Sequence, residues 1–223
     1  MERSVDELVN VEVYYESLCP DSMRFVVQQL VPAHKVIGNY INVTYFPYGK
    51  ATKITNENGT EQWNFTCQHG DAECYGNKAQ ACAINEILTN SEISDEQQVL
   101  VNFVGCVMAA SNPAVAVPQC LETIGIDANY ISLVNNCIES TDGDELLAAY
   151  GDKTHALEPT LTFVPTIVIN EVFSQENQDN ALVDFQSLIC QYISAASQPA
   201  VCNGSTSKHT NHICTNCLCR KRN

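Results

Sequence analysis

The chain has 223 residues, enough for one large domain or a domain with a sizeable insertion, and its 45% hydrophobic content can form a core. Its formal charge of −15 argues against nucleic acid as a partner, because phosphates must be neutralised by a basic surface. No apolar run approaches the roughly 18 residues that a membrane helix needs. We therefore expect a folded, soluble chain without a membrane span.

Twelve cysteines indicate an oxidising compartment, where they pair as disulfides rather than remain as thiols. Asn-x-Ser/Thr triplets, the acceptors of N-linked glycans in secreted chains, point to the same compartment. The sequence therefore predicts a glycoprotein of the secretory pathway. The four triplets begin at Asn42, Asn58, Asn64 and Asn203.

The first part of the chain predicts a strand, a helix and a second strand. Residues 11–18 alternate apolar and polar side chains as a half-buried strand requires, and Cys19-Pro20 ends that pattern. Apolar residues then recur at helical spacing from Phe25 as far as Pro32, and residues 41–46 alternate again. This order gives a βαβ unit with parallel strands.

A helical insertion is expected from about residue 50 to 159, after a polar surface stretch at 49–66. A buried strand then returns at 163–170 with a short hairpin partner at 171–173, and an amphipathic helix around 182–192 closes the domain. We predict one domain over residues 1–198 and a cysteine-rich tail over 199–223. Helices of the insertion are expected near 74–89, 94–110, 127–138 and 143–150.

This layout predicts an α/β, thioredoxin-like fold with a large disulfide-rich helical insertion. Cys19 would stand at a helix N-terminus, where unpaired backbone N–H groups stabilise a thiolate, so it is the candidate nucleophile. Pro165 is the candidate cis proline facing that sulfur. The alternatives are a structural disulfide for Cys19 and an ordinary edge-strand proline for Pro165.

The run CQHGDAECYGNKAQAC at residues 67–82 resembles the signature of the gamma-interferon-inducible lysosomal thiol reductase (GILT) family, C-Q-H-G-x2-E-C-x2-N-x4-C. The resemblance extends to YYESLCPDS at 14–22, PYGKA at 47–51 and FVPT at 163–166. It implies a thiol-disulfide oxidoreductase of the lysosome or the secreted fraction that uses no cofactor and acts on protein disulfides. The signature residues are Cys67, Gln68, His69, Gly70, Glu73, Cys74, Asn77 and Cys82.

Cys67, His69 and Cys74 could also be considered as zinc ligands. An oxidising compartment favours disulfides over thiolate metal sites, however. We therefore predict that Cys67, Cys74 and Cys82 are structural disulfide cysteines and that no metal is bound.

The active site of the family that the sequence resembles is Cys-x-x-Cys, in which the second cysteine releases the substrate captured by the first. Here the second position is Ser22, and a hydroxyl cannot resolve a mixed disulfide. Nearby carboxylates at Glu16 and Asp21 also oppose thiolate formation. We therefore predict weak or absent dithiol reductase activity and a binding or regulatory role, with an unidentified protein partner. The alternative is a reductase that uses Cys19 alone with an external small thiol.

Setting Cys19 aside leaves eleven cysteines, so another is free, one pairs between chains, or Cys19 itself is in a disulfide. The tail superficially resembles a metal knot, but a disulfide-bonded tail and a disulfide-linked homodimer fit the compartment better. A helical lipid-binding module over 67–137 would leave the βαβ unit unexplained. The tail residues concerned are His209, His212, Cys214, Cys217 and Cys219.

Overall fold

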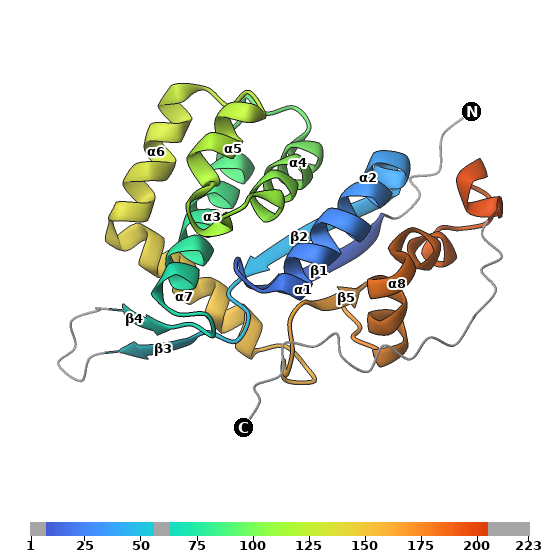
Figure 1. Cartoon of the computed structure of the whole chain (residues 1–223). Coiled ribbons are helices and arrows are strands. Elements are labelled where there is room, and N and C mark those ends of the chain that lie inside the picture. Colours follow the sequence, from blue (N-terminus) through green and yellow to red (C-terminus); the bar gives the residue numbers. More distant parts are fainter. Residues whose placement is uncertain (1–7, 56–62, 205–223) are drawn as a thin grey trace.

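A computed structural model describes residues 8–55 and 63–204 of the chain (Figure 1). Its central sheet has the strand order β2-β1-β5, where β1 is Val9–Tyr15, β2 is Ile41–Pro47 and β5 is Thr166–Ile169. Strand β2 is parallel to β1, and β5 is antiparallel to it. The predicted βαβ unit and the predicted sheet that joins the N-terminal strands to the last strand are confirmed.

Two predicted strand boundaries were wrong. Strand β1 ends at Tyr15 rather than residue 18, because residues 16–19 form a turn closed by a backbone hydrogen bond from Cys19 to Glu16. The hairpin partner expected at 171–173 is a single bridge between Ile169 and Val172.

The first helical run continues past Pro32, where the sequence predicted its end. It comprises α1 (Pro20–Phe25), a π-helical turn (Val26–Leu30), α2 (Val31–Ile37) and a short 3-10 turn (Gly38–Tyr40). A proline inside an α-helix lacks an N–H and clashes with the carbonyl four residues earlier. The wider turn before Pro32, in which the Val31 N–H donates to the Val26 carbonyl, provides the space.

The insertion contains all the expected helices and two elements that the sequence did not predict. The helices are α3 (Asp71–Thr89), α4 (Glu96–Ala109), α5 (Val117–Thr123), α6 (Ala128–Glu139) and α7 (Thr141–His155). Helices α3 to α6 gather beside β2 in Figure 1, while α8 (Gln175–Tyr192) packs by β5. One unpredicted element is α5. The other is a two-stranded antiparallel sheet, β3 (Thr52–Thr55) and β4 (Trp63–Thr66), in the stretch expected to be a surface loop.

Both faces of the central sheet are covered. Val11, Val13 and Tyr15 of β1 point into the main core, which α2, α3, α4 and α8 complete. Tyr14 and Phe46 stack on the opposite face with ring centroids 4.3 Å apart. The end of β1, from which the Cys19 turn emerges, is therefore fixed from both sides.

The edge strand β2 is partly capped by a side chain. Gln97 of α4 accepts a hydrogen bond from the Val43 N–H at 2.7 Å and donates one to the Val43 carbonyl at 3.3 Å. These bonds occupy backbone groups that an exposed sheet edge would offer to another chain. The N-cap of α4 is Asp95, whose side chain accepts from the Gln98 N–H.

Four disulfides join eight of the nine described cysteines: Cys67–Cys74, Cys82–Cys137, Cys106–Cys120 and Cys190–Cys202. The prediction that Cys67, Cys74 and Cys82 form disulfides is confirmed. Asn58, a predicted glycosylation site, lies outside the described residues, as do tail residues 205–223. The covalent dimer through the tail and the domain boundaries therefore stay predictions. No helix within 8–55 or 63–204 is long and apolar enough to cross a membrane.

Candidate active site

Cys19 stands at the N-cap of α1, as the sequence predicts. Its N–H donates to the Glu16 carbonyl at 3.3 Å, and its carbonyl accepts from the Met23 N–H at 3.0 Å. The Cys19 and Ser22 side chains are both fully buried, and the Ser22 hydroxyl has no hydrogen-bond partner in the described part of the chain. Asp21, between them, pairs with Arg24 at 2.8 Å, which offsets part of its negative charge.

The peptide bond between Val164 and Pro165 is cis, as predicted. The Cys19 thiol lies 3.8 Å from the Val164 carbonyl oxygen, at hydrogen-bonding distance for sulfur. Gln178 of α8 holds this segment, because it donates to the Pro165 carbonyl at 3.0 Å and accepts from the Ile167 N–H at 2.8 Å. The cis-proline segment and the Cys19 turn therefore face each other.

The first half of the signature forms a disulfide-closed loop at the start of α3. Cys67 pairs with Cys74, and Gly70 between them adopts a φ of +82°, which side chains rarely allow. Glu73 is fully buried; it accepts a hydrogen bond from the His69 N–H at 3.0 Å and pairs with His69 Nδ1 at 2.5 Å. The loop therefore presents an imidazole and a carboxylate as one hydrogen-bonded unit.

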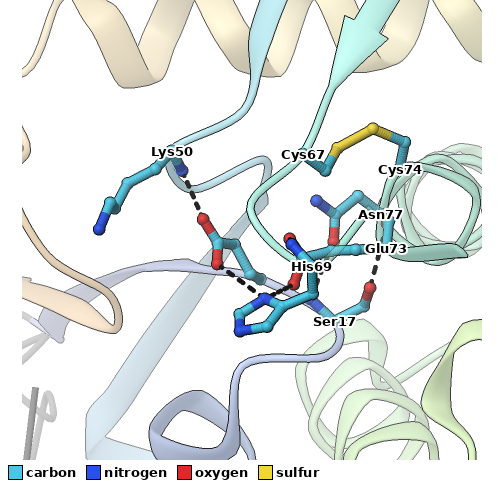
Figure 2. The surroundings of a disulfide bond; sticks show 8 residues. Ser17, Lys50, Cys67, His69, Glu73, Cys74 and Asn77 are labelled. Atoms are coloured by element: carbon cyan, nitrogen blue, oxygen red, sulfur yellow. Dashed lines mark hydrogen bonds and ion pairs between the residues drawn. A yellow bond between two sulfur atoms is a disulfide. The ribbon is translucent and has the colours of Figure 1, made fainter. Parts of the chain in front are cut away.

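The second half of the signature binds the turn that precedes Cys19 (Figure 2). The Asn77 side-chain oxygen accepts from the Ser17 N–H at 2.8 Å, and the Ser17 hydroxyl donates to the Glu73 carbonyl at 3.2 Å. Gly76 permits this approach, since a Cβ there would lie 2.6 Å from the Ser17 hydroxyl oxygen. Two signature residues remain. Gln68 is half-buried in the disulfide-closed loop, and its side-chain oxygen has no hydrogen-bond partner among the described residues. Cys82 is not at this contact, because its disulfide to Cys137 joins α3 to α6.

Glu16 is the functional candidate whose role sequence reasoning missed, since it was considered only as a nearby negative charge. Its fully buried carboxyl accepts from the Lys50 N–H at 2.8 Å and lies 3.6 Å from His69 Nδ1. Burial, and next the charge of Glu73, raise the pKa of Glu16 to about 7, although the Lys50 hydrogen bond and His69 act in the opposite direction. The sequence feature that could have indicated a role for Glu16 is its place in the YYESLCPDS segment, which resembles the GILT family. We refer to Glu16, His69 and Glu73 as the Glu16 cluster.

The zinc site considered from the sequence is excluded, because Cys67 and Cys74 are joined to each other and cannot be thiolate ligands. Among the described residues, the Glu16 cluster alone places potential metal-binding atoms of three such side chains within 4.8 Å of one another. His69 Nδ1 and the Glu73 oxygen are in hydrogen-bond contact, and a cation bound at about 2.0–2.2 Å from each would have to separate them. As it stands, His69 and Glu73 are hydrogen-bonded to each other, and Glu16 lies at ion-pair distance from His69.

Comparisons with known proteins identify the family of this chain. The profile of the gamma interferon inducible lysosomal thiol reductase (GILT) family matches residues 10–124, just over half of the chain. The chain is also 40% identical to GILT-like protein 1 of Drosophila melanogaster over 202 residues, which cover 87% of this chain and 78% of the fly protein. The chain belongs to the GILT family.

Another GILT-family relative is the gamma-interferon-inducible lysosomal thiol reductase of Carassius auratus, 30% identical over 208 residues that cover 93% of this chain and 77% of that one. Among solved structures, DsbA of Chlamydia trachomatis superposes with a TM-score of 0.52 over 78% of this chain and 82% of its own, at 13% identity. This likeness concerns the fold alone. It confirms the predicted thioredoxin-like architecture of this GILT-family chain.

Proposed function

We propose that this GILT-family chain captures protein disulfides through Cys19 but does not complete a dithiol reductase cycle. The observation that carries the proposal is Ser22, which occupies the position where the resemblance implies the resolving cysteine. It lies in the first turn of α1, with its hydroxyl buried and without a hydrogen-bond partner among the described residues. The chain is then a binding or regulatory protein on a reductase scaffold.

The chemistry divides at the second step. The Cys19 thiolate attacks a substrate disulfide, forms a new S–S bond to one substrate sulfur and releases the other as a thiolate, which takes up a proton. In a dithiol enzyme a second thiolate then attacks Cys19 and expels the captured sulfur, leaving an intramolecular disulfide. Ser22 cannot form that disulfide, so release needs an external thiol. The complete burial of Cys19 further requires its surroundings to open before a protein disulfide reaches it.

We also propose a secreted or lysosomal location. The four disulfides among the described residues support it, because a reducing compartment would leave these cysteines as thiols. Asn64 and Asn203 of the glycosylation triplets are exposed, whereas the Asn42 amide donates to the Asn10 side chain at 2.9 Å. We expect glycans on Asn64 and Asn203 before Asn42.

The test is insulin reduction by the wild-type chain and by Ser22→Cys, at acidic and at neutral pH, with Cys19→Ala as the inactive control. We expect Ser22→Cys to turn over at least about tenfold faster, because release becomes intramolecular. Mass spectrometry without reductant should detect a substrate disulfide on Cys19 of the wild-type chain. A folded Ser22→Cys that is no faster would refute the proposal.

The same assay separates the monothiol alternative. A small thiol such as glutathione is added to the wild-type reaction over a range of concentrations. A wild-type turnover that rises with this thiol to the rate of Ser22→Cys would make the chain an enzyme and refute the binding role. We expect the added thiol to release the captured substrate without reaching that rate.

A further inference from the structure

Three segments far apart in the sequence meet at the Glu16 carboxyl group. Glu16 belongs to YYESLCPDS, Lys50 and Gly49 belong to PYGKA, and His69 belongs to the CQHG signature. One Glu16 oxygen accepts from the Lys50 N–H at 2.8 Å, and the other lies 3.6 Å from His69 Nδ1. Gly49, with a φ of +59°, lies so close that a Cβ there would be 2.3 Å from Glu16 Cγ. The side chain of Glu16 is thus enclosed by contacts from both other segments.

Glu16 is linked to Cys19 through the backbone of one turn. The Cys19 N–H bonds the Glu16 carbonyl, and the intervening Ser17 is fixed by Asn77 and by the Glu73 carbonyl. The side chains of Glu16 and Cys19 are both fully buried, so solvent screens a charge on either of them weakly. Glu16 and Cys19 are therefore buried side chains on one hydrogen-bonded turn.

Burial and the charge of Glu73 favour a proton on Glu16, whereas His69 and Lys50 oppose it. Its neighbours are Glu73 and His69 from the signature and Lys50 from the loop after β2. The two carboxyl groups share one imidazole, and the Glu16 oxygen nearer to that ring has no hydrogen-bond partner among the described residues. A proton on Glu16 relieves the repulsion from Glu73.

We propose that Glu16 is a positioning residue that couples proton uptake by the Glu16 cluster to the reactivity of Cys19. This inference rests on the proposed function, in which Cys19 is the reacting thiol. When the pH falls, Glu16 takes up a proton and a negative charge disappears from the Cys19 turn. Formation of the Cys19 thiolate is then opposed less, so its reactivity declines less steeply with acidity than that of an isolated thiol.

The test measures the rate at which iodoacetamide, a small neutral reagent, alkylates Cys19 between pH 5.5 and 8.5, with the Cys19 peptide quantified by mass spectrometry. In Glu16→Gln we expect a tenfold fall in rate for each pH unit below thiol ionisation. The wild-type rate should equal that of Glu16→Gln at pH 5.5 and fall about threefold to tenfold below it at pH 8, with a bend near pH 7.

His69→Gln provides a second variant, at a partly exposed position where a substitution is better tolerated. Because His69 favours the ionised form of Glu16, its removal should move the bend to higher pH. Glu12→Gln is the matched control, since it removes a carboxylate of the adjoining strand β1 that accepts a hydrogen bond from the Tyr14 hydroxyl, outside the cluster. It should leave the wild-type profile unchanged.

Two outcomes separate this inference from the proposed function. A reactive Cys19 with parallel profiles in wild type and Glu16→Gln would overturn the inference alone. A Cys19 that no reagent modifies at any pH, in any of the variants, would overturn the proposed function and this inference with it. A purely structural role for Glu16 would change the rate by the same factor at every pH, and that result also contradicts the coupling.

Discussion

Glu16→Gln should make the chain more stable at neutral pH and leave its stability in acid unchanged. Burial and the Glu73 charge raise the pKa of Glu16 from an ordinary 4.5 to about 7. Between these values the folded protein holds a proton that the unfolded chain has lost, so the free energy of unfolding falls as the pH rises. The difference between the two pKa values corresponds to about 3 kcal/mol in the free energy of unfolding. This contribution is present below pH 4.5 and is lost as the pH rises through 7. Glutamine cannot ionise, and its side-chain oxygen can still accept from the Lys50 N–H.

The assay is denaturant unfolding with disulfides intact, at pH values from 4.5 to 8, for wild type, Glu16→Gln and the control Glu12→Gln. We expect Glu16→Gln and wild type to coincide near pH 4.5 and to separate by up to roughly 3 kcal/mol at pH 7.5, with Glu16→Gln the more stable. A difference that is constant over the whole range would refute the reasoning. The Glu16 carboxyl would then not titrate between the two pH limits.

Two further predictions concern stability. The ring of His34 is buried without a hydrogen-bond partner in the described residues, and burial lowers its pKa below 6.5. The folded state therefore loses stability as the pH falls through 6.5. His34→Leu should lessen the drop in thermal unfolding midpoint between pH 7.5 and pH 5. Replacing Cys82 and Cys137 by alanine, which opens a disulfide of sequence separation 55, should cost about 4 kcal/mol in urea unfolding. Replacing Cys106 and Cys120, with separation 14, should cost about 3 kcal/mol, and the reverse order would contradict the chain-entropy argument.

The alternation of apolar and polar residues and the position of one proline predicted the parts of the fold that depend on neighbouring residues in the sequence. Alternation along 11–18 and 41–46 predicted the strands found at 9–15 and 41–47, and a proline that opens a buried strand at Pro165 predicted the cis peptide. The helix that continues through Pro32 was missed because a π-helical turn, which has no simple sequence pattern, removes the clash. Strands β3 and β4 were missed because their polar composition resembles that of a loop.

The candidate site was only partly predictable for a different reason. Cys19 and Pro165 could be named because each stands at a recognisable position relative to a helix or strand. Ser22 could be named only through the resemblance to the Cys-x-x-Cys site of the GILT family. The partners of Glu16 come from around residues 50 and 69, and no periodicity indicates that these segments meet at the same carboxyl group. The cysteine pairing was likewise open, since Cys82 pairs with a cysteine 55 residues away and Cys67 with one only seven away.

The contacts of the signature explain how the scaffold can persist with serine at position 22. Within the described part of the chain, Ser22 takes no part in the hydrogen bonds and ion pairs of Asn77, Glu73 and His69. These bonds hold Glu16 and Ser17, which precede Cys19. Ser22 lies on the other side of Cys19, in the first turn of α1. A change between cysteine and serine at position 22 would therefore leave the bonds that fix the Cys19 turn in place. Under the proposed function, the contacts that hold the Cys19 turn are separable from the chemistry that would release a captured substrate.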